Sequence, residues 1–331
     1  MRRILRIILL VLVLFGILYF LGPKPAPPVL GGSLPPVPEG SIALEGYVKR
    51  KEAGFRTRPH NEARICWADS LHQKTPYSVV YLHGFSASEK EGDPVHHDFA
   101  RQFGYNLYLS RLNGHGLDTS EPLLNMTSAG LWQDAKEALA IGKKLGHKVI
   151  LVGTSTGGTL ALLLAAEFPD DVAAVINLSP NIAINEAMIG LLDEPWGIYL
   201  ARLVKGSKYN EYKPENPEKS KYWYTKYRLE AVVELENLVS HTMTPELFRR
   251  VHQPVLNLYY YKNEQEQDHT VKVSAILDMH QHLGTPAALK RAVAIPNAGA
   301  HVIGSSITSA DVPAVSAAIS RWWKEISANQ N

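Results

Sequence analysis

Several classes of function need residues that are scarce in this sequence. Cys66 is its single cysteine, so neither a disulfide framework nor a zinc site built from cysteines can form. The formal net charge is only +2, and no basic stripe with interleaved aromatic residues runs along the chain. Nucleic acid is therefore not an expected partner.

Uncharged apolar runs that approach the length of a membrane span are also scarce, and one lies near the N-terminus. Residues 7–21 are apolar and uncharged, and they follow Arg2, Arg3 and Arg6. No small-x-small cleavage site or lipobox cysteine comes after them. We predict that residues 1–21 form a single transmembrane anchor, with the arginines cytoplasmic and the catalytic domain on the extracytoplasmic side. The alternative is a secreted protein from which a signal peptide has been removed.

The remainder of the chain has the length and composition of one large α/β domain with an insertion. The sequence has 331 residues, of which 45% are hydrophobic and 20% charged. Residues 22–40 are rich in proline and predict an extended linker without a core of its own. We assign residues 41–180 and 253–331 to the α/β core, and residues 181–252 to an inserted helical cap.

The most informative stretch is residues 149–166, VILVGTSTGGTLALLLAA. An apolar run ends at Gly153, small residues follow, and a second apolar run continues at helical length. Strand, tight turn and helix in this order are the context in which G-x-S-x-G marks a nucleophile elbow. The turn strains Ser155, so its neighbours two positions away must be small, as Gly153 and Gly157 are. No lysine follows in phosphate-loop spacing, and the glycines do not form G-x-G-x-x-G, which argues against a nucleotide site.

Other strand and helix patterns alternate around this elbow. Apolar runs at 64–68, 78–82, 106–109, 173–178, 255–260 and 293–295 predict strands, and helices are expected between most of them. Alternation with short loops requires a mostly parallel sheet with right-handed crossovers. On the predicted helix 94–103, His96 and His97 are adjacent and should not face one side together, so we expect no metal site there.

Residues 181–252 differ from the rest in being rich in charged and aromatic residues. They lie between two core strands, where insertions in open α/β sheets shape ligand pockets. We predict a cap over an apolar slot, with Trp223 and Tyr227 from the cap and Ser86 from the core as candidate pocket residues.

An acidic loop follows the strand 255–260, and a histidine follows the last strand. The loop after strand 255–260 offers three carboxylates, Asp268, Glu264 and Glu266, and a triad needs one of them. Asp268 is preferred because it precedes a transition into a helix. His301 ends the small-residue turn PNAGAH after the last strand, which can deliver it towards Ser155.

The H-G-F run at 83–85, G-T-S-T-G at 153–157, an acid near 268 and His301 together resemble the α/β-hydrolase superfamily. The resemblance covers about residues 64–324, and the position of the insertion is similar to that in the serine hydrolase branch that includes monoacylglycerol lipases and carboxylesterases. It implies an α/β-hydrolase fold with Ser155 as nucleophile, His301 as base and Asp268 as its orienting acid. It also implies that the backbone N–H groups of Phe85 and Thr156 form the oxyanion hole, although Thr156 stands where many relatives carry Met, Gln or Leu.

The reaction implied is hydrolysis of a carboxylic ester through an acyl-enzyme, with neither a metal nor an organic cofactor. The anchor and the aromatic-rich insertion favour a lipidic or small apolar ester, such as one resembling a monoacylglycerol. Peptidases, thioesterases and acyltransferases use the same chemistry and stay open as alternatives. A further alternative is a chain that kept the fold and binds a partner without catalysis.

Overall fold

A seven-stranded sheet runs through the centre of the computed structural model, which describes residues 2–328. Its spatial order is β1-β3-β2-β4-β5-β8-β9. The strands are β1 (Arg64–Cys66), β2 (Thr75–Leu82), β3 (Asn106–Leu109), β4 (Gly146–Thr154), β5 (Val172–Leu178), β8 (Val255–Tyr259) and β9 (Lys290–Ala294). Only β1 is antiparallel to its neighbour, β3. The parallel strands therefore end at one common edge, where the loops after β2, β4, β8 and β9 meet.

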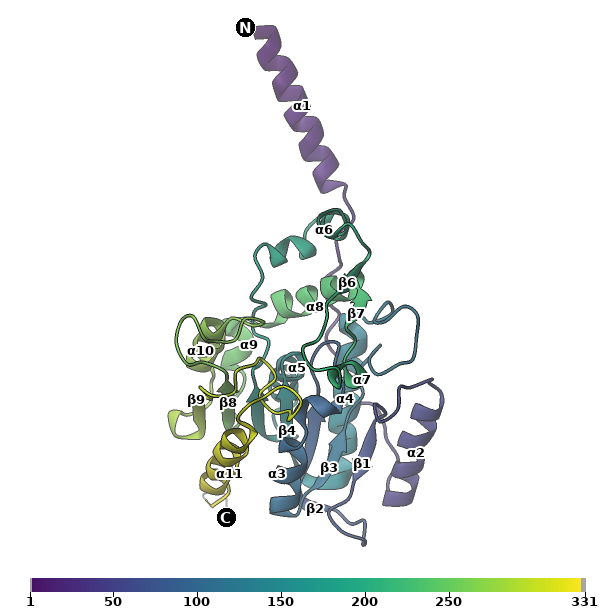
Figure 1. Ribbon diagram of the computed structural model, residues 1–331, viewed down its shortest axis with the longest axis vertical. Coiled ribbons are helices and arrows are strands. Elements are labelled where there is room, and N and C mark those ends of the chain that lie inside the picture. The colour runs from purple at the N-terminus through teal and green to yellow at the C-terminus, as the bar shows by residue number, and fades with distance from the viewer. Residues whose placement is uncertain (1, 329–331) are drawn as a thin grey trace.

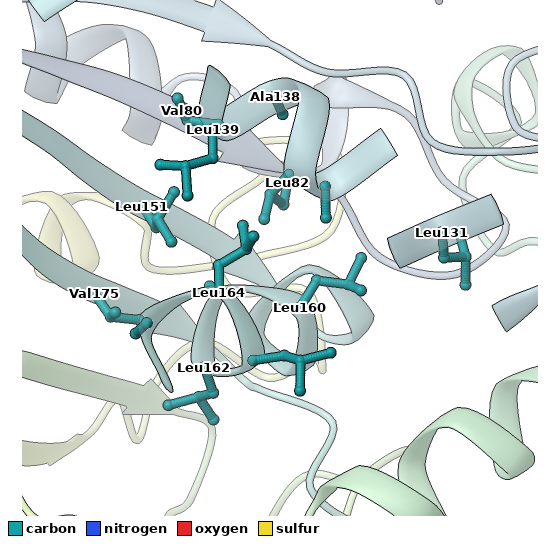
Figure 2. Close-up of a cluster of buried hydrophobic side chains, with 14 of the residues drawn as sticks. Val80, Leu82, Leu131, Ala138, Leu139, Leu151, Leu160, Leu162, Leu164 and Val175 are labelled. Atoms are coloured by element: carbon teal, nitrogen blue, oxygen red, sulfur yellow. The ribbon is translucent and has the colours of Figure 1, made fainter. Parts of the chain in front are cut away.

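Helices cover both faces of this sheet because successive side chains of a buried strand point to opposite sides. In β2, Val80 and Leu82 belong to one core and Val79 and Tyr81 to the other. The first core contains α2 (Ser41–Ala53), α4 (Ser128–Leu145), α5 (Thr156–Glu167), α9 (Pro245–Arg249) and α10 (Val273–His282). Figure 2 shows side chains of α4 and α5 meeting those of the sheet in this core. The second core contains α3 (Val95–Phe103) and α11 (Val312–Ala328), whose Trp322 and Trp323 are buried.

The segment between β5 and β8 lies over the edge where the strands end (Figure 1). It consists of η2 (Ile189–Asp193), α6 (Gly197–Lys205), β6 (Tyr209–Glu211), α7 (Lys219–Tyr222), β7 (Lys226–Arg228), α8 (Leu229–Thr242) and α9. We expected helices only, but β6 and β7 form a two-stranded antiparallel sheet. Asn210 Nδ2 donates to Tyr227 Oη across this pair, 2.8 Å away, a cross-strand contact that no helical periodicity could reveal.

The first helix, α1 (Arg2–Phe20), projects away from the body of the molecule, and none of its residues is buried (Figure 1). The following segment, 22–40, contains no helix or strand. This segment is attached to the domain, because the partly buried side chains of Leu30, Leu34 and Val37 pack against the first core. Trp132 Nε1 and Lys136 Nζ of α4 both donate to the Gly31 carbonyl oxygen, at 3.3 and 2.7 Å.

Most predicted elements are present, with shifted ends. The last strand begins three residues before the predicted start, at Lys290, because pairing with β8 extends to that residue. The final helix begins at Val312, well before the apolar pattern from Ile319 that we used. Asp311 Oδ1 accepts the Ala314 N–H at 3.2 Å, so a capping residue followed by Pro313 was the missed start signal. Short helices η1 (Glu89–Gly92) and η3 (Ala287–Leu289) complete the fold.

Candidate active site

The turn between β4 and α5 has the strained geometry expected of a nucleophile elbow. Ser155 has φ +52° and ψ −117°, a conformation that costs free energy for any residue with a side chain. A Cβ added at Gly153 would lie 2.4 Å from the backbone of Gly157, and one added at Gly157 would lie 1.8 Å from the Leu82 carbonyl oxygen. The two glycines are therefore required by close backbone approach, as the sequence predicted.

Hydrogen bonds fix the Ser155 backbone from both sides. Its N–H donates to the Leu178 carbonyl at 3.0 Å, and its own carbonyl accepts the N–H groups of Gly158, Thr159 and Asn181. Ser155 is 6% exposed and lines a cavity at the edge of the sheet. The side chain thus lies at the N-terminus of α5, where the helix dipole favours negative charge.

His301 reaches the same cavity from the loop after β9. Its Nδ1 lies 2.6 Å from Asp268 Oδ2. A carboxylate only accepts, so Nδ1 carries the proton and Nε2 is left as the basic nitrogen. Burial disfavours the imidazolium, but the adjacent Asp268 carboxylate outweighs it and raises the pKa of His301 above its ordinary value.

Asp268 is held by the chain on its other oxygen. Its Oδ1 accepts the N–H groups of Thr270 and Val271 at 2.8 and 3.1 Å, and the residue is 1% exposed. Burial opposes ionisation of this carboxyl, but the His301 charge and these hydrogen bonds lower its pKa below the ordinary value. Glu264 and Glu266, the other two candidates, are exposed and bind within their own loop, Glu264 to Tyr261 and Glu266 to Lys262 and Asn263.

The loop after β2 leaves one backbone donor between two that are occupied. The Gly84 N–H donates to Glu91 Oε2, and the Ser86 N–H donates to His115 Nε2 at 3.0 Å. Among the described residues, the Phe85 N–H between them has no acceptor. It is available to a ligand in the cavity, as is expected of an oxyanion donor. Thr156 is buried at the start of α5, and its Oγ1 has no hydrogen-bond partner within the described range.

His83 and His115 shape this loop. His83 Nε2 accepts the Leu112 N–H at 3.0 Å and its Nδ1 donates to the Gly84 carbonyl at 2.9 Å. Burial lowers the pKa of His83 to about 4, so the ring is neutral near pH 7. His115 packs against it edge to face. Both rings hold the loop in shape.

The cavity has a volume of about 650 Å³ and an uneven lining. Apolar side chains include Phe85, Ile184, Val232, Leu235, Val271 and Ile307, whereas Asn181, Tyr212, Lys213, Asn216, Lys219 and Thr308 contribute polar groups. Ser86, Trp223 and Tyr227, the three pocket residues predicted from sequence, all line it. The Tyr227 ring meets the Phe85 ring edge to face, with centroids 5.1 Å apart, so the cap closes directly onto the loop after β2.

Sequence reasoning missed Glu91, which also lines the cavity. It lies in the charged stretch EKEGD, which is typical of a solvated turn, yet it is only 2% exposed. Burial raises its pKa to about 7. A carboxylate closely following the loop after β2 was the one available signal, and it is weak.

Close to this site, Glu89, His96 and His97 form a group whose ligand atoms lie within 4.8 Å of one another. This corrects our expectation that adjacent histidines would be kept apart. The short α3 begins directly after the η1 turn, so the Glu89 carboxylate reaches both rings. Glu89 is already paired with Arg64 at 2.6 Å, and His96 Nε2 lies 2.9 Å from the Glu89 carbonyl, so these groups join β1, η1 and α3.

A strained serine, a histidine bound to a buried aspartate and a free loop N–H in one cavity define the class of serine hydrolases with the α/β-hydrolase fold. Residues 73–265 match the model of the family described as serine aminopeptidase, S33. The chain belongs to this family, and within it resembles monoacylglycerol lipases.

Among curated proteins, the thermostable monoacylglycerol lipase of Bacillus sp. (strain H-257) is 29% identical over 170 residues. The alignment spans 50% of this chain and 63% of the relative, which is less than two thirds of the relative's length.

Solved structures support the fold. One of the metagenome-derived lipolytic enzymes LipS and LipT matches with a TM-score of 0.62 at 20% identity, covering 81% of this chain and 100% of the other. The monoacylglycerol lipase of Paleococcus ferrophilus matches with a TM-score of 0.57 at 17% identity, covering 79% and 98%.

Proposed function

We propose that this protein is a membrane-anchored serine hydrolase that cleaves carboxylic esters. Ser155 is the nucleophile, His301 the general base and Asp268 the acid that orients it. The observation that carries the proposal is the 2.6 Å hydrogen bond between His301 Nδ1 and Asp268 Oδ2, in the same cavity as the strained Ser155.

The reaction follows from the protonation states of these groups. His301 Nε2 removes the Ser155 hydroxyl proton while Oγ attacks the ester carbonyl, and the imidazolium then protonates the leaving alcohol. The Phe85 and Thr156 N–H groups stabilise the oxyanion of each tetrahedral intermediate. Water, activated by His301, releases the carboxylic acid from the acyl-enzyme.

The cavity supports an amphiphilic ester of moderate size. Its volume of about 650 Å³ lies within the range of small-molecule sites. The apolar side chains suit an acyl chain, and the polar ones suit an alcohol part that keeps hydroxyl groups. The curated relative, a monoacylglycerol lipase, is named for a substrate of this kind.

Two features support membrane anchoring. The 19 residues of α1 extend over about 28 Å, close to the thickness of a bilayer core, and none is buried. Trp196 at the start of α6 contacts the end of this helix, since its Nε1 donates to the Leu18 carbonyl at 3.1 Å. In Figure 1, α6 lies at the part of the body nearest to α1.

The apolar surface around α6 belongs to the same argument. Large apolar side chains are exposed at Met188, Leu191, Trp196, Tyr199, Leu200, Leu203 and Val204. Such a group is a liability in water, whereas a lipid surface beside the anchor would accommodate it.

The decisive experiment is covalent labelling of the full chain, in detergent micelles, with a fluorophosphonate probe. Intact mass should increase by one adduct on the native protein and by none on Ser155→Ala. A folded native chain that takes up no probe would contradict the hydrolase assignment and favour a binding protein.

A series of p-nitrophenyl esters, peptide anilides and thioesters would then show which kind of acyl bond is cleaved. We expect ester hydrolysis to exceed the others in kcat/KM. Faster cleavage of an anilide would replace the esterase by a peptidase while leaving the role of Ser155 intact.

A further inference from the structure

Glu91 is a buried acid at the centre of the site that the proposed mechanism does not use. It lies in η1, the single turn that follows the oxyanion loop, and is 2% exposed. Its neighbours Glu89 and Asp93 are neutralised by Arg64 and Lys90. Glu91 has no cation within 4.0 Å among residues 2–328, although it lies between these two paired acids.

Its position is fixed by Gly84. The Gly84 N–H donates to Glu91 Oε2. A Cβ added at Gly84 would lie 2.8 and 2.9 Å from the two Glu91 oxygens and 2.9 Å from the Ser155 Cβ. The carboxylate and the nucleophile therefore lie on either side of one glycine, with no room for a side chain between them.

This hydrogen bond constrains the next peptide. The Phe85 N–H follows the Gly84 N–H directly, and its direction depends on how the peptides on either side are held. Glu91 holds the first of them and His115 holds the Ser86 N–H beyond. Preorganised donors stabilise an oxyanion because they need not reorient during the reaction.

Glu91 also faces the catalytic base and the cap. Side chains from four parts of the chain interact with it electrostatically or by hydrogen bonds. They are His301 in the loop after β9, Lys219 and Trp223 at the two ends of α7, Tyr212 after β6, and Tyr81 in β2. Of these five side chains, only His301 and Lys219 can carry a positive charge. Lys219 forms no ion pair within the described residues, and its Nζ lies 5.6 Å from the ring centroids of both Tyr212 and Trp223.

We propose that Glu91 is a positioning residue, which fixes the oxyanion loop through the Gly84 N–H and whose negative charge favours the imidazolium form of His301. This inference rests on the proposed function, because it assigns Glu91 a part in the same reaction. Two carboxylates then act on His301, Asp268 by a direct hydrogen bond and Glu91 through space.

The two roles can be separated with two substitutions in the full chain. Glu91→Gln keeps an oxygen that accepts the Gly84 N–H but removes the charge. We expect its kcat on a short p-nitrophenyl ester, measured at the alkaline plateau, to stay within about threefold of the native value. The acid limb of its kcat/KM profile should move to lower pH by about half a unit, because His301 loses a nearby carboxylate that is only partly ionised over this limb, its own pKa being about 7.

Glu91→Ala removes the acceptor as well. Its kcat should fall about tenfold or more with a smaller change in KM, since the Phe85 N–H is no longer held in place. The matched control is Asp93→Asn, which removes a negative charge two residues away that does not line the cavity. Its pH profile should superimpose on that of the native protein.

Unfolding temperatures and fluorophosphonate labelling accompany each variant. A native acid limb in Glu91→Gln contradicts the charge effect, and a native kcat in Glu91→Ala contradicts the positioning role. If Glu91→Ala does not fold, the test rests on Glu91→Gln. A folded Glu91→Gln whose plateau kcat is tenfold or more below the native value overturns the proposal. A native protein that is folded but takes up no probe contradicts the proposed function instead.

Discussion

The floor and the roof of the cavity are held in place by different forces. The floor is made by the ends of β2 and β4, where backbone segments touch and a single methyl group at Gly153 or Gly157 would collide with main-chain atoms. The roof is made by the cap, where Trp223 and Tyr227 are placed by side-chain packing and hydrogen bonds. The turn that carries Ser155 is therefore fixed by backbone sterics, whereas the cap side of the cavity depends on side chains that can be exchanged.

The largest effect should come from Asp268, which backbone N–H groups hold in the loop after β8. Asp268→Asn keeps the shape but leaves an amide that no longer stabilises the His301 imidazolium, so kcat should fall by on the order of 10³–10⁴. Ester hydrolysis at pH 8 is the measurement. Glu264→Gln and Glu266→Gln are the matched controls and should retain native rates, because both side chains are exposed and bind within their loop. A loss in either control as large as in Asp268→Asn would contradict this assignment.

Backbone packing in the floor gives the next prediction. A Cβ at Gly157 would lie 1.8 Å from the Leu82 carbonyl oxygen, so Gly157→Ala should destabilise the fold by roughly 3 kcal/mol or more. Gly190→Ala in the cap is the comparison, because nothing lies within 4 Å of its added Cβ. Thermal unfolding is the measurement, and Gly157→Ala should unfold at a clearly lower temperature than Gly190→Ala. Similar unfolding temperatures would contradict the proposed difference between floor and roof.

Substitutions in the roof should change selectivity more than chemistry. Tyr227→Ala removes the ring that packs on Phe85, and kcat/KM for longer acyl esters should fall about tenfold while short esters change less. Tyr227→Phe keeps the ring and loses only the hydrogen bond to Asn210, so it should stay within about threefold. An acyl-chain series measures both, and a uniform loss over all chain lengths would place Tyr227 with the floor.

The smallest effect is expected at the outer surface of the cap. Leu203 and Val204 are 79% and 75% exposed, so Leu203→Ser with Val204→Ser should change the free energy of unfolding by less than about 0.5 kcal/mol. Hydrolysis of a soluble ester should be unchanged, whereas hydrolysis of an ester embedded in phospholipid vesicles should fall a few fold. Equal losses on both substrates would show that these residues act within the cavity rather than at a lipid surface.

The two groups of residues also differed in how far they could be predicted. Ser155, Gly153 and Gly157 lie within five residues, so the local pattern of strand, turn and helix predicts their geometry. Trp223 and Tyr227 were predicted as pocket residues only because the insertion had to lie over the strand edge. Their partners Lys219 and Tyr212 were missed, since aromatic and charged residues on short cap elements have no period that indicates which way they face.

Glu91 is the clearest case of a residue hidden from sequence reasoning. Its neighbours Glu89, Lys90 and Asp93 are polar, so local sequence predicts a solvated turn. Its carboxylate is buried by contacts around Gly84 and Ser155 and by Trp223, which lies more than 100 residues further along the chain. The His96 and His97 grouping has the same origin, because Glu89 approaches both rings from outside their helix.

By itself, the sequence determined the parallel sheet, the tight turn at Ser155 and the order in which Ser155, the acidic loop and His301 follow one another along the chain. These follow from periodicity and local sterics, which act between residues a few positions apart. Only the tertiary structure decided that Asp268, rather than Glu264 or Glu266, contacts His301, and that Glu91 lies beside Ser155. Such choices depend on which loops meet at the edge of the sheet, and burial and hydrogen bonding between distant segments exist only once the chain has folded.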